Sequence, residues 1–324
     1  MRYIFPFMII LLNTPAIAQD PEFSQFYSNP IYLNPAMAGA NGCPEIHLNN
    51  RDQWMNISGA YVTNSVTYDA YAPSLRGGLA FMITNDMAGQ NTLNWTTVNL
   101  AYAYHLQLSA NWKLQIGGQT SWNQKFLDWN KLSFGDQIHP KDGFVYRTND
   151  LPSNLIKNSS WSTRGFFDVS AGFFIHNPKF YAGFAAKHLN EPNQSMTLRN
   201  SELSARYTFH AGFNYEIGGQ SPGIQTATVY PNFLYTYHSG AKQWNLGCYV
   251  HYRSVTFGAW VREGDAFILS MGVETGVYKI GYSYDATIST LTNASGGSHE
   301  ISLSFSLPCK EMPKLFRTVN CPSF

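Results

Sequence analysis

Apolar and polar residues alternate along most of this chain, and residues 298–307 near its end show the pattern clearly. From Ile301 on, every second residue is apolar and the residues between are serines: Ile301, Leu303, Phe305 and Leu307 against Ser302, Ser304 and Ser306. Successive side chains of a β-strand point to opposite faces, so such a strand has one apolar and one polar face. The alternation recurs about fourteen times, with little sequence between the repeats to form a covering core. The pattern predicts an all-β protein, a transmembrane outer-membrane β-barrel of about 14 antiparallel strands.

The first residues have the pattern of an export signal. Arg2 precedes an apolar run at residues 3–12, and Ala16-Ile17-Ala18 has the small-x-small form of a signal peptidase site. Residues 1–18 are therefore predicted to be removed, leaving a mature chain that begins near Gln19. No later apolar run approaches the roughly 20 residues that a membrane-spanning helix needs.

The composition fits a barrel in lipid better than a soluble domain. Charged residues make up 13% and aromatic residues 15% of the chain, whereas soluble domains carry about 25% charged residues. Aromatic rings settle where hydrocarbon meets headgroups, so they suit the girdles of a barrel. The alternative is an ordinary all-β secreted protein. Removing Arg2 brings the formal charge from +1 to (21 − 1) − 20 = 0, so no nucleic-acid partner is expected.

Residues 19–42 do not alternate. Pro21, Pro30 and Pro35 make a long helix or a paired central strand unfavourable there. Because the segment is rich in Phe and Tyr, we expect it to pack inside the periplasmic mouth as a plug. The barrel itself is predicted over residues 43–308, followed by a periplasmic C-terminal tail at residues 309–324.

The connections between predicted strands alternate in length. Tight turns are expected at residues 73–76, 109–111, 177–178 and 253–254, and longer loops at residues 53–64, 125–164 and 287–297. Short periplasmic turns and longer external loops are typical of outer-membrane barrels. The stretch at residues 125–164 is long for a mere connection and is the largest candidate for a functional loop.

Four cysteines in an exported chain permit disulfides. Cys43, Cys309 and Cys321 fall outside or at the ends of predicted strands, whereas Cys248 lies on an apolar face and is interpreted as a small lipid-facing residue. A bridge at Cys309 is favoured, and its partner stays open between Cys321, which would clip the tail, and Cys43, which would join the first and last strands.

The strong motifs of catalysis are absent from the sequence, including phosphate-binding glycine loops and paired Cys-x-x-Cys. His105, His210 and His251 fall on predicted lumen faces, where polar side chains are needed in any case. No enzymatic activity, cofactor or metal is therefore expected.

Three stretches carry a family resemblance. Residues 19–39, QDPEFSQFYSNPIYLNPAMAG, resemble the signature that opens mature members of the PorP/SprF family of Bacteroidetes. Residues 49–54, NNRDQW, are similar to that family's Arg-x-Gln-Trp element, and residues 126–137, FLDWNKLSFGDQ, to its mid-chain Asp-Gln segment. The motif positions taken as the family signature and plug are Asp20, Pro21, Phe23, Ser24, Phe26, Tyr27, Asn34, Pro35 and Gly39.

The resemblance implies a bacterial outer-membrane component of the type IX secretion system, which serves gliding motility and adhesin export. Its implied partners are the C-terminal signal domain of a secreted surface adhesin, the secretion translocon and the periplasmic ring, with outer-membrane lipid around the barrel. If the loop at residues 125–164 holds such a domain, a few buried anchors would supply the affinity. The candidates for cargo contact are Phe126, Trp129, Phe134 and Phe144, and packing of the loop on the barrel rim is the alternative role for these rings.

Two rival functions use the same barrel. One is an outer-membrane transport channel for a small or hydrophobic solute, with the N-terminal segment as its gate. The other is a passive anchor for the periplasmic ring, held by the N-terminal segment and the tail.

Overall fold

The computed structural model describes residues 20–57, 59–139, 141–145, 161–196, 200–218, 227–289 and 295–308. The predicted signal peptide (residues 1–18) and the predicted C-terminal tail (residues 309–324) lie outside the described residues. The described helices are α1 (Pro30–Leu33) and the 3-10 turns η1 (Pro35–Met37), η2 (Pro73–Leu75), η3 (Trp129–Lys131) and η4 (Gly135–Gln137). None of these helices has the length and apolar character needed to cross a membrane.

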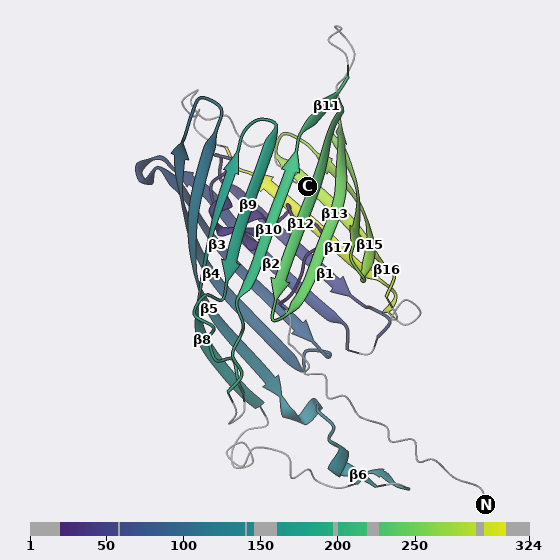
Figure 1. Cartoon of the computed structure of the whole chain (residues 1–324). Helices are drawn as coiled ribbons and strands as arrows, with labels where there is room; N and C mark the ends of the chain where they lie inside the picture. The colour runs from purple at the N-terminus through teal and green to yellow at the C-terminus, as the bar shows by residue number, and fades with distance from the viewer. Residues whose placement is uncertain are drawn as a thin grey trace, which may run out of the picture.

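The described strands form a closed antiparallel barrel of 14 strands, as the alternation predicted (Figure 1). The barrel strands are β1 (Glu45–Gln53), β2 (Tyr61–Ala72), β3 (Gly77–Ala88), β4 (Leu93–Gln107), β5 (Lys113–Asp128), β8 (Trp161–His176), β9 (Phe180–Lys187), β10 (Arg206–Phe213), β12 (Ala227–His238), β13 (Ala241–Tyr252), β14 (Val255–Arg262), β15 (Ala266–Glu274), β16 (Tyr278–Thr287) and β17 (Ser298–Ser306). The short strand β11 (Tyr215–Ile217) extends the edge of β12, and β6 (Ile138–His139) pairs with β7 (Gly143–Phe144) in a separate hairpin.

Closure is made by β1 and β17, which pair from Glu45↔Ser306 to Gln53↔Ser298. A lipid-embedded sheet must close, because an open edge would leave backbone groups without partners in hydrocarbon. The two ends of the barrel differ. We call the end with the connections at residues 73–76, 108–112, 177–179 and 253–254 the turn end, and the opposite end, with the connections at residues 54–60, 129–160 and 188–205, the loop end.

The outer face of the barrel is apolar. Leu100, Ile116, Leu246 and Phe257 are each more than half exposed, which is expected of side chains that contact lipid. Cys248 lies on this face, is half-buried and carries a free thiol.

The inner face is less uniformly polar than the sequence predicted. Polar residues such as Thr67 and Asn99 are buried on it, but so are large apolar side chains. These apolar residues form one cluster with side chains of the N-terminal segment: Phe26, Tyr27, Leu33 and Met37 against Phe174, Tyr181, Tyr230, Leu234, Tyr249, Trp260 and Ile268. The lumen therefore holds a hydrophobic core of its own, formed between the N-terminal segment and the wall.

The longest predicted loop is shorter than expected. β5 and β8 continue in register from Lys125↔Arg164 to Asp128↔Trp161, so both ends of the predicted loop at residues 125–164 belong to strands. The two strands extend beyond the rim of the shorter strands because their backbone amides and carbonyls continue to form hydrogen bonds with each other there. The connecting segment is residues 129–160, of which residues 129–139 and 141–145 are described.

Cys43 is disulfide-bonded. Cys309 and Cys321 lie outside the described residues. Just before them, the Leu307 amide donates to the Pro44 carbonyl at 2.9 Å, so the end of β17 lies beside the residue that follows Cys43.

Glycines on the inner face let the N-terminal segment approach the wall closely. A Cβ built on Gly78 would lie 2.0 Å from the Ala38 carbonyl oxygen, and one on Gly117 would lie 2.5 Å from the Ala36 Cα. Backbone therefore contacts backbone at these points, and any side chain in place of the glycine hydrogen would collide with it.

We predict that Gly117→Ala lowers the stability of the barrel by about 1–3 kcal/mol, the usual cost of overpacking. Gly118→Ala is the matched control, because the neighbouring Gly118 has nothing within 4 Å of its built Cβ. Thermal unfolding of the two purified variants in detergent measures the difference. Equal effects of the two substitutions would contradict the close approach of residues 35–36 to β5.

Candidate functional site

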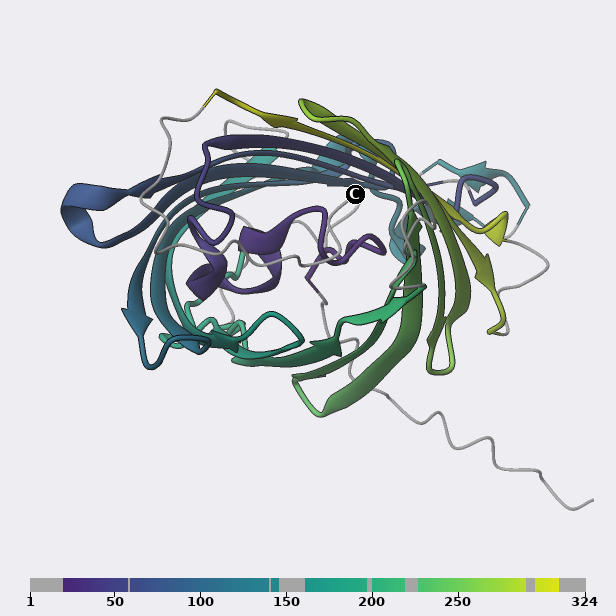
Figure 2. The ribbon, with the colours of Figure 1, turned by 90° about the horizontal axis from the view of Figure 1, so that it is seen from above.

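The N-terminal segment lies inside the ring of strands (Figure 2). Its contacts show that it runs from the loop end to the turn end. At the loop end, Asp20 contacts His188, which directly follows β9. At the turn end, the Gly39 amide donates to the Asp69 carboxylate at 2.6 Å. The sequence analysis expected this segment in the periplasmic mouth, whereas here it extends along the lumen and reaches the opposite end.

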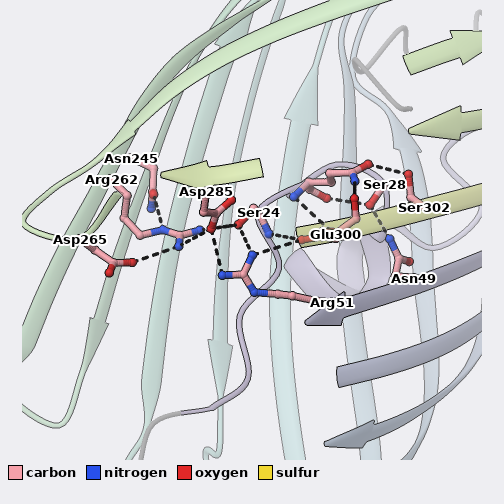
Figure 3. Close-up of polar contacts among 11 residues, drawn as sticks. Ser24, Ser28, Asn49, Arg51, Asn245, Arg262, Asp265, Asp285, Glu300 and Ser302 are labelled. Carbon is pink, nitrogen blue, oxygen red and sulfur yellow. Dashed lines mark hydrogen bonds and ion pairs between the residues drawn. The ribbon is translucent and has the colours of Figure 1, made fainter. Parts of the chain in front are cut away.

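A network of buried charges surrounds Ser24 (Figure 3). The Ser24 hydroxyl donates to Asp285 at 2.5 Å and accepts from Arg262 at 3.0 Å. It also accepts a hydrogen bond from Arg51. The backbone amide of Ser24 donates to the Glu300 carboxylate at 2.5 Å. One small residue of the segment thus contacts charged side chains of β1, β14, β16 and β17.

The charges in this network are paired with one another. Arg51 lies 2.9 Å from Asp285 and 3.6 Å from Glu300, and Arg262 lies 3.2 Å from both Asp285 and Asp265. The side chains of Arg51, Arg262, Asp285 and Glu300 are at most 3% exposed. Removing one partner of such a buried group leaves an uncompensated charge, which costs about 3–5 kcal/mol.

A second charged cluster holds the start of the segment. The imidazole of His188 lies between two carboxylates, 2.9 Å from Asp20 and 2.9 Å from Asp168. Arg206 lies 3.4 Å from Asp20 and 3.1 Å from Glu22. Both charged clusters lie toward the loop end of the lumen, so the first residues of the segment are bound there by ion pairs.

These contacts change how the two groups outside the strands titrate. Burial alone would lower the pKa of His188, but the charge of Asp20 and the hydrogen bonds with Asp168 and Asp20 raise the pKa to about 9. Burial alone would raise the pKa of Asp20, but His188 and Arg206 hold the pKa of that carboxyl well below its usual range. The pair is therefore ionised across the neutral range.

Apart from the bond to the Asp69 carboxylate, the turn half of the segment is held by hydrogen bonds that involve backbone groups. The Asn34 side-chain amide donates to the Phe173 carbonyl at 3.0 Å, and its oxygen accepts from the Ala36 amide at 2.9 Å. His105 binds the Ala38 carbonyl at 2.8 Å. Together with the glycine contacts, these bonds fix residues 34–39 against the wall.

The structure brings all nine predicted motif residues together in the lumen. Asp20, Phe23, Ser24, Phe26, Tyr27, Asn34, Pro35 and Gly39 are buried, and Pro21 is half-buried. Sequence reasoning missed their partners on the wall, namely Arg51, His188, Arg206, Arg262, Asp285 and Glu300. The available signal was the position of these charges on polar phases of strands near the loop end.

The four predicted cargo-contact residues lie elsewhere, at or beyond the loop end. Phe126 is a residue of β5 paired with Thr163 rather than part of a loop, which corrects its placement. Trp129 and Phe134 stack with ring centroids 6.5 Å apart, and the Trp129 indole donates to Ser162 at 2.8 Å. Phe144 lies in β7. The rings of Trp129 and Phe134 are therefore already engaged in packing the connection itself.

The hairpin of β6 and β7 lies apart from the barrel, beyond the ends of β5 and β8 (Figure 1). Its exposed apolar side chains are Ile138, 50% exposed, and Val145, 56% exposed. The sequence analysis did not single out these two residues, because aliphatic residues in a polar loop carry no distinct pattern.

The three lumen histidines are not assembled into one site. His105 binds the Ala38 carbonyl, His210 lies 3.2 Å from the Asn34 amide nitrogen, and His251 lies 2.8 Å from the Thr256 hydroxyl. Within the described ranges, no group of three or more His, Cys, Asp or Glu side chains is suited to hold a metal ion.

The fold and the alternating faces define an outer-membrane β-barrel protein. The family model of the type IX secretion system membrane protein PorP/SprF matches residues 16–305, so the chain belongs to this family. The resemblance noted in the sequence is thereby confirmed, and membership implies a membrane component of the type IX secretion system.

Solved structures of similar shape are distant in sequence. The KdgM porin is 5% identical, with a TM-score of 0.37 over 82% of this chain and 99% of the porin. The CymD monoaromatic hydrocarbon channel is 10% identical, with a TM-score of 0.43 over 86% of this chain and 93% of the channel. A FadL homologue of Pseudomonas aeruginosa is 11% identical, with a TM-score of 0.38 over 84% of this chain and 92% of that protein. Among curated proteins, none matches.

We predict that Arg51→Leu destabilises the barrel by about 3–5 kcal/mol, because Asp285 and Glu300 then lose a buried cation. Glu274→Gln is the control, since its ion pair with Lys279 lies at the turn end and Glu274 is 39% exposed. Exposed pairs of this kind contribute about 0–1 kcal/mol. Urea unfolding of the two variants in detergent compares them, and a loss in Arg51→Leu no larger than in the control would disprove the role of the network.

We also predict a pH dependence carried by His188. Its pKa in the folded state exceeds its ordinary value of 6.5, so its stabilisation is complete below pH 6.5 and is lost as the pH rises through about 9. The difference in melting temperature between the wild type and His188→Gln should shrink over this window. Asn85→Ala is the control, because Asn85 does not titrate and donates to the neutral side chains of Asn94 and Thr96, and its difference from the wild type should stay flat. If the difference in melting temperature between the wild type and His188→Gln does not change with pH, the charge of His188 does not contribute to the stability of the barrel.

Proposed function

We propose that this protein is a non-enzymatic component of the type IX secretion system that binds the C-terminal signal domain of a secreted surface adhesin at the outer membrane. In this proposal the projecting hairpin of β6 and β7 makes first contact with the cargo, and residues 20–42 act as a plug. The observation that carries the proposal is the exposed apolar pair on a hairpin held away from the barrel.

The hairpin suits a protein partner for a physical reason. Ile138 and Val145 are exposed and lie on the two strands of the hairpin, where the Val145 amide donates to the Gln137 carbonyl at 3.1 Å. Because Ile138 pairs with Phe144, Ile138 and Val145 point to opposite faces of the hairpin. Exposed apolar side chains on the two faces of a projecting hairpin gain free energy when a partner encloses the hairpin and covers them. Trp129 and Phe134 would then support the hairpin, and affinity would come from the aliphatic pair.

The buried segment supports a receptor rather than an open pore. Residues 20–39 occupy the lumen from end to end and are held by paired charges at one end and by backbone contact at the other. A conducting pore would need these bonds broken, whereas cargo binding at the rim would not.

The second candidate is an outer-membrane transport channel for a small or hydrophobic solute. The observation in its favour is that two small cavities, of about 50 and 30 Å³, remain beside the segment. A single-channel recording in a planar bilayer distinguishes the two candidates, since a plugged receptor should stay closed with or without small solutes.

We predict that the double substitution Ile138→Asp and Val145→Asp lowers recovery of the adhesin by about tenfold or more, since anchor residues are worth over 1 kcal/mol each. The measurement is affinity purification of the tagged barrel from its native outer membrane, with mass spectrometry of the bound proteins. Leu75→Asp is the matched control, because Leu75 is 48% exposed but lies in η2 at the turn end.

The outcome also separates the remaining functions. Loss of the adhesin with retained periplasmic ring components would support the proposal. If only ring components are recovered with the wild type, the protein is an anchor for the ring and the receptor function is excluded.

A further inference from the structure

One edge of β8 has no neighbouring strand at the loop end of the barrel. β8 pairs with β5 along its whole length, from Asp128↔Trp161 to Lys113↔His176. On its other side β8 pairs with β9, but only from Ala171 to His176. β9 and β10 are 8 residues long, whereas β8 has 16 residues. The first half of β8 therefore extends beyond the loop-end limit of β9, with a paired strand on one side only.

The backbone groups along this edge alternate in direction. Successive residues of an antiparallel strand direct their amide and carbonyl to one neighbour and then to the other. The Val169 carbonyl accepts from the Leu189 amide at 2.9 Å, and the Val169 amide donates to the Asn190 side-chain oxygen at 3.0 Å. Odd-numbered residues of β8 therefore direct their backbone groups to the side of β9, and even-numbered residues direct theirs to β5.

Several of the edge groups have no hydrogen-bond partner among the described residues. The Phe167 carbonyl accepts from the Asn190 side-chain amide at 2.8 Å. Nearer the loop end, the part of the chain that the structure describes offers no bond to this side of β8, which leaves the amides of Thr163, Gly165 and Phe167 and the carbonyls of Thr163 and Gly165. These groups follow one another at the spacing of a strand, so a further strand can bond all of them.

Nothing in the sequence of this edge protects it from pairing. Edge strands commonly carry a Lys, a Pro or a β-bulge that prevents another chain from adding to them. Residues 163–167 contain no proline and one charged residue, Arg164. The Arg164 side chain donates to the Asn193 carbonyl at 3.2 Å. The register with β5 is continuous over this stretch, so no bulge interrupts it. The edge is therefore free to accept a partner strand.

The outer side of the edge is apolar. Phe167 pairs in register with Trp122 of β5, and both side chains are about half exposed. Leu189, whose amide bonds to β8, is also about half exposed. A Cβ built on Gly165 would lie 2.7 Å from the Trp122 ring, so this ring covers the outer side of Gly165 and reaches the edge. A strand added here would bury apolar surface as well as form backbone hydrogen bonds.

We propose that the edge from Thr163 to Phe167 binds an extended segment of a partner protein, which adds to the sheet as a strand antiparallel to β8. The segment carries apolar residues at the alternate positions that face outward. In this mode of recognition the main-chain hydrogen bonds give affinity, and the alternate side chains give specificity. A second copy in the same membrane cannot pair in this way, because its β8 runs in the same direction and antiparallel pairing needs the opposite one.

This inference goes beyond the proposed function. It concerns a surface other than the hairpin of β6 and β7, and it holds whether or not that hairpin binds cargo.

The test is photo-crosslinking in the native outer membrane, with p-benzoylphenylalanine in place of Thr163 in one protein and in place of Phe167 in another. Both replacements keep the backbone amide. Mass spectrometry locates the residue of the partner to which each probe attaches. We expect both probes to attach to one segment of one partner. Moving the probe from position 163 to position 167 should move the attachment site about four residues toward the N-terminus of that segment, because antiparallel strands run in opposite directions with nearly equal rise.

Thr163→Pro should lower the amount of adduct formed by the probe at position 167 about tenfold or more, because proline removes the free amide and places its ring on the edge. The bonds to β5 are kept, since the Thr163 amide points away from β5. Thr163→Val is the matched control, because it keeps the amide, and it should leave the amount of adduct unchanged. Heat-modifiable migration on gels reports the folding of each variant. The movement of the attachment site tests the proposal even if Thr163→Pro does not fold.

Other results would overturn the proposal. An adduct of two barrels would make the edge an interface between copies of this chain. Attachment within residues 146–160 or 197–199 of the same chain would mean that the chain covers its own edge. An attachment site that stays in place, or moves in the same direction as the probe, would exclude antiparallel addition. If no adduct forms, or if Thr163→Pro and Thr163→Val give equal amounts, the edge amides bond to water alone.

Discussion

Backbone amides and carbonyls in hydrocarbon have no water to bond, and this constraint governs the whole structure. It forces the strands to pair with each other until β17 meets β1. Once the sheet is closed, each strand has one face toward lipid and one toward an enclosed lumen. A barrel of 14 strands is wider than its own side chains can fill, so the interior needs further contents, and residues 20–42 supply part of them.

The segment is bound differently at its two ends. Toward the turn end it lies against glycines, and backbone meets backbone at Gly78 and Gly117. Toward the loop end it is held through Ser24 and Asp20 by charged side chains of five strands, namely β1, β10, β14, β16 and β17, and by His188. Steric contact with the glycines does not respond to solution conditions, whereas ion pairs and hydrogen bonds to titratable groups respond to pH, and ion pairs also to salt and to competing charges. The start of the segment is therefore the part that conditions at the loop end can loosen.

The two sides of the lumen differ in how closely they contact the N-terminal segment. On the side of β14, β16, β17 and β1, polar groups of the wall bond directly to Ser24 and Gln25. On the side of β3, β4, β5 and β8, polar residues of the wall line a small cavity of about 50 Å³ beside the segment. The segment is therefore bonded more closely to one side of the lumen than to the other.

Local alternation was enough to predict the strands, their number and their lipid-facing side, because the period of a strand depends only on neighbouring residues. The sequence motif likewise indicated the family. It did not reveal that Ser24 meets Asp285 and Glu300, which lie more than 250 residues away in sequence, since such pairs come together only when the barrel closes. For the same reason, the apolar cluster inside the lumen, the extension of β5 through Phe126 and the path of residues 20–42 toward the loop end were decided by the tertiary structure alone.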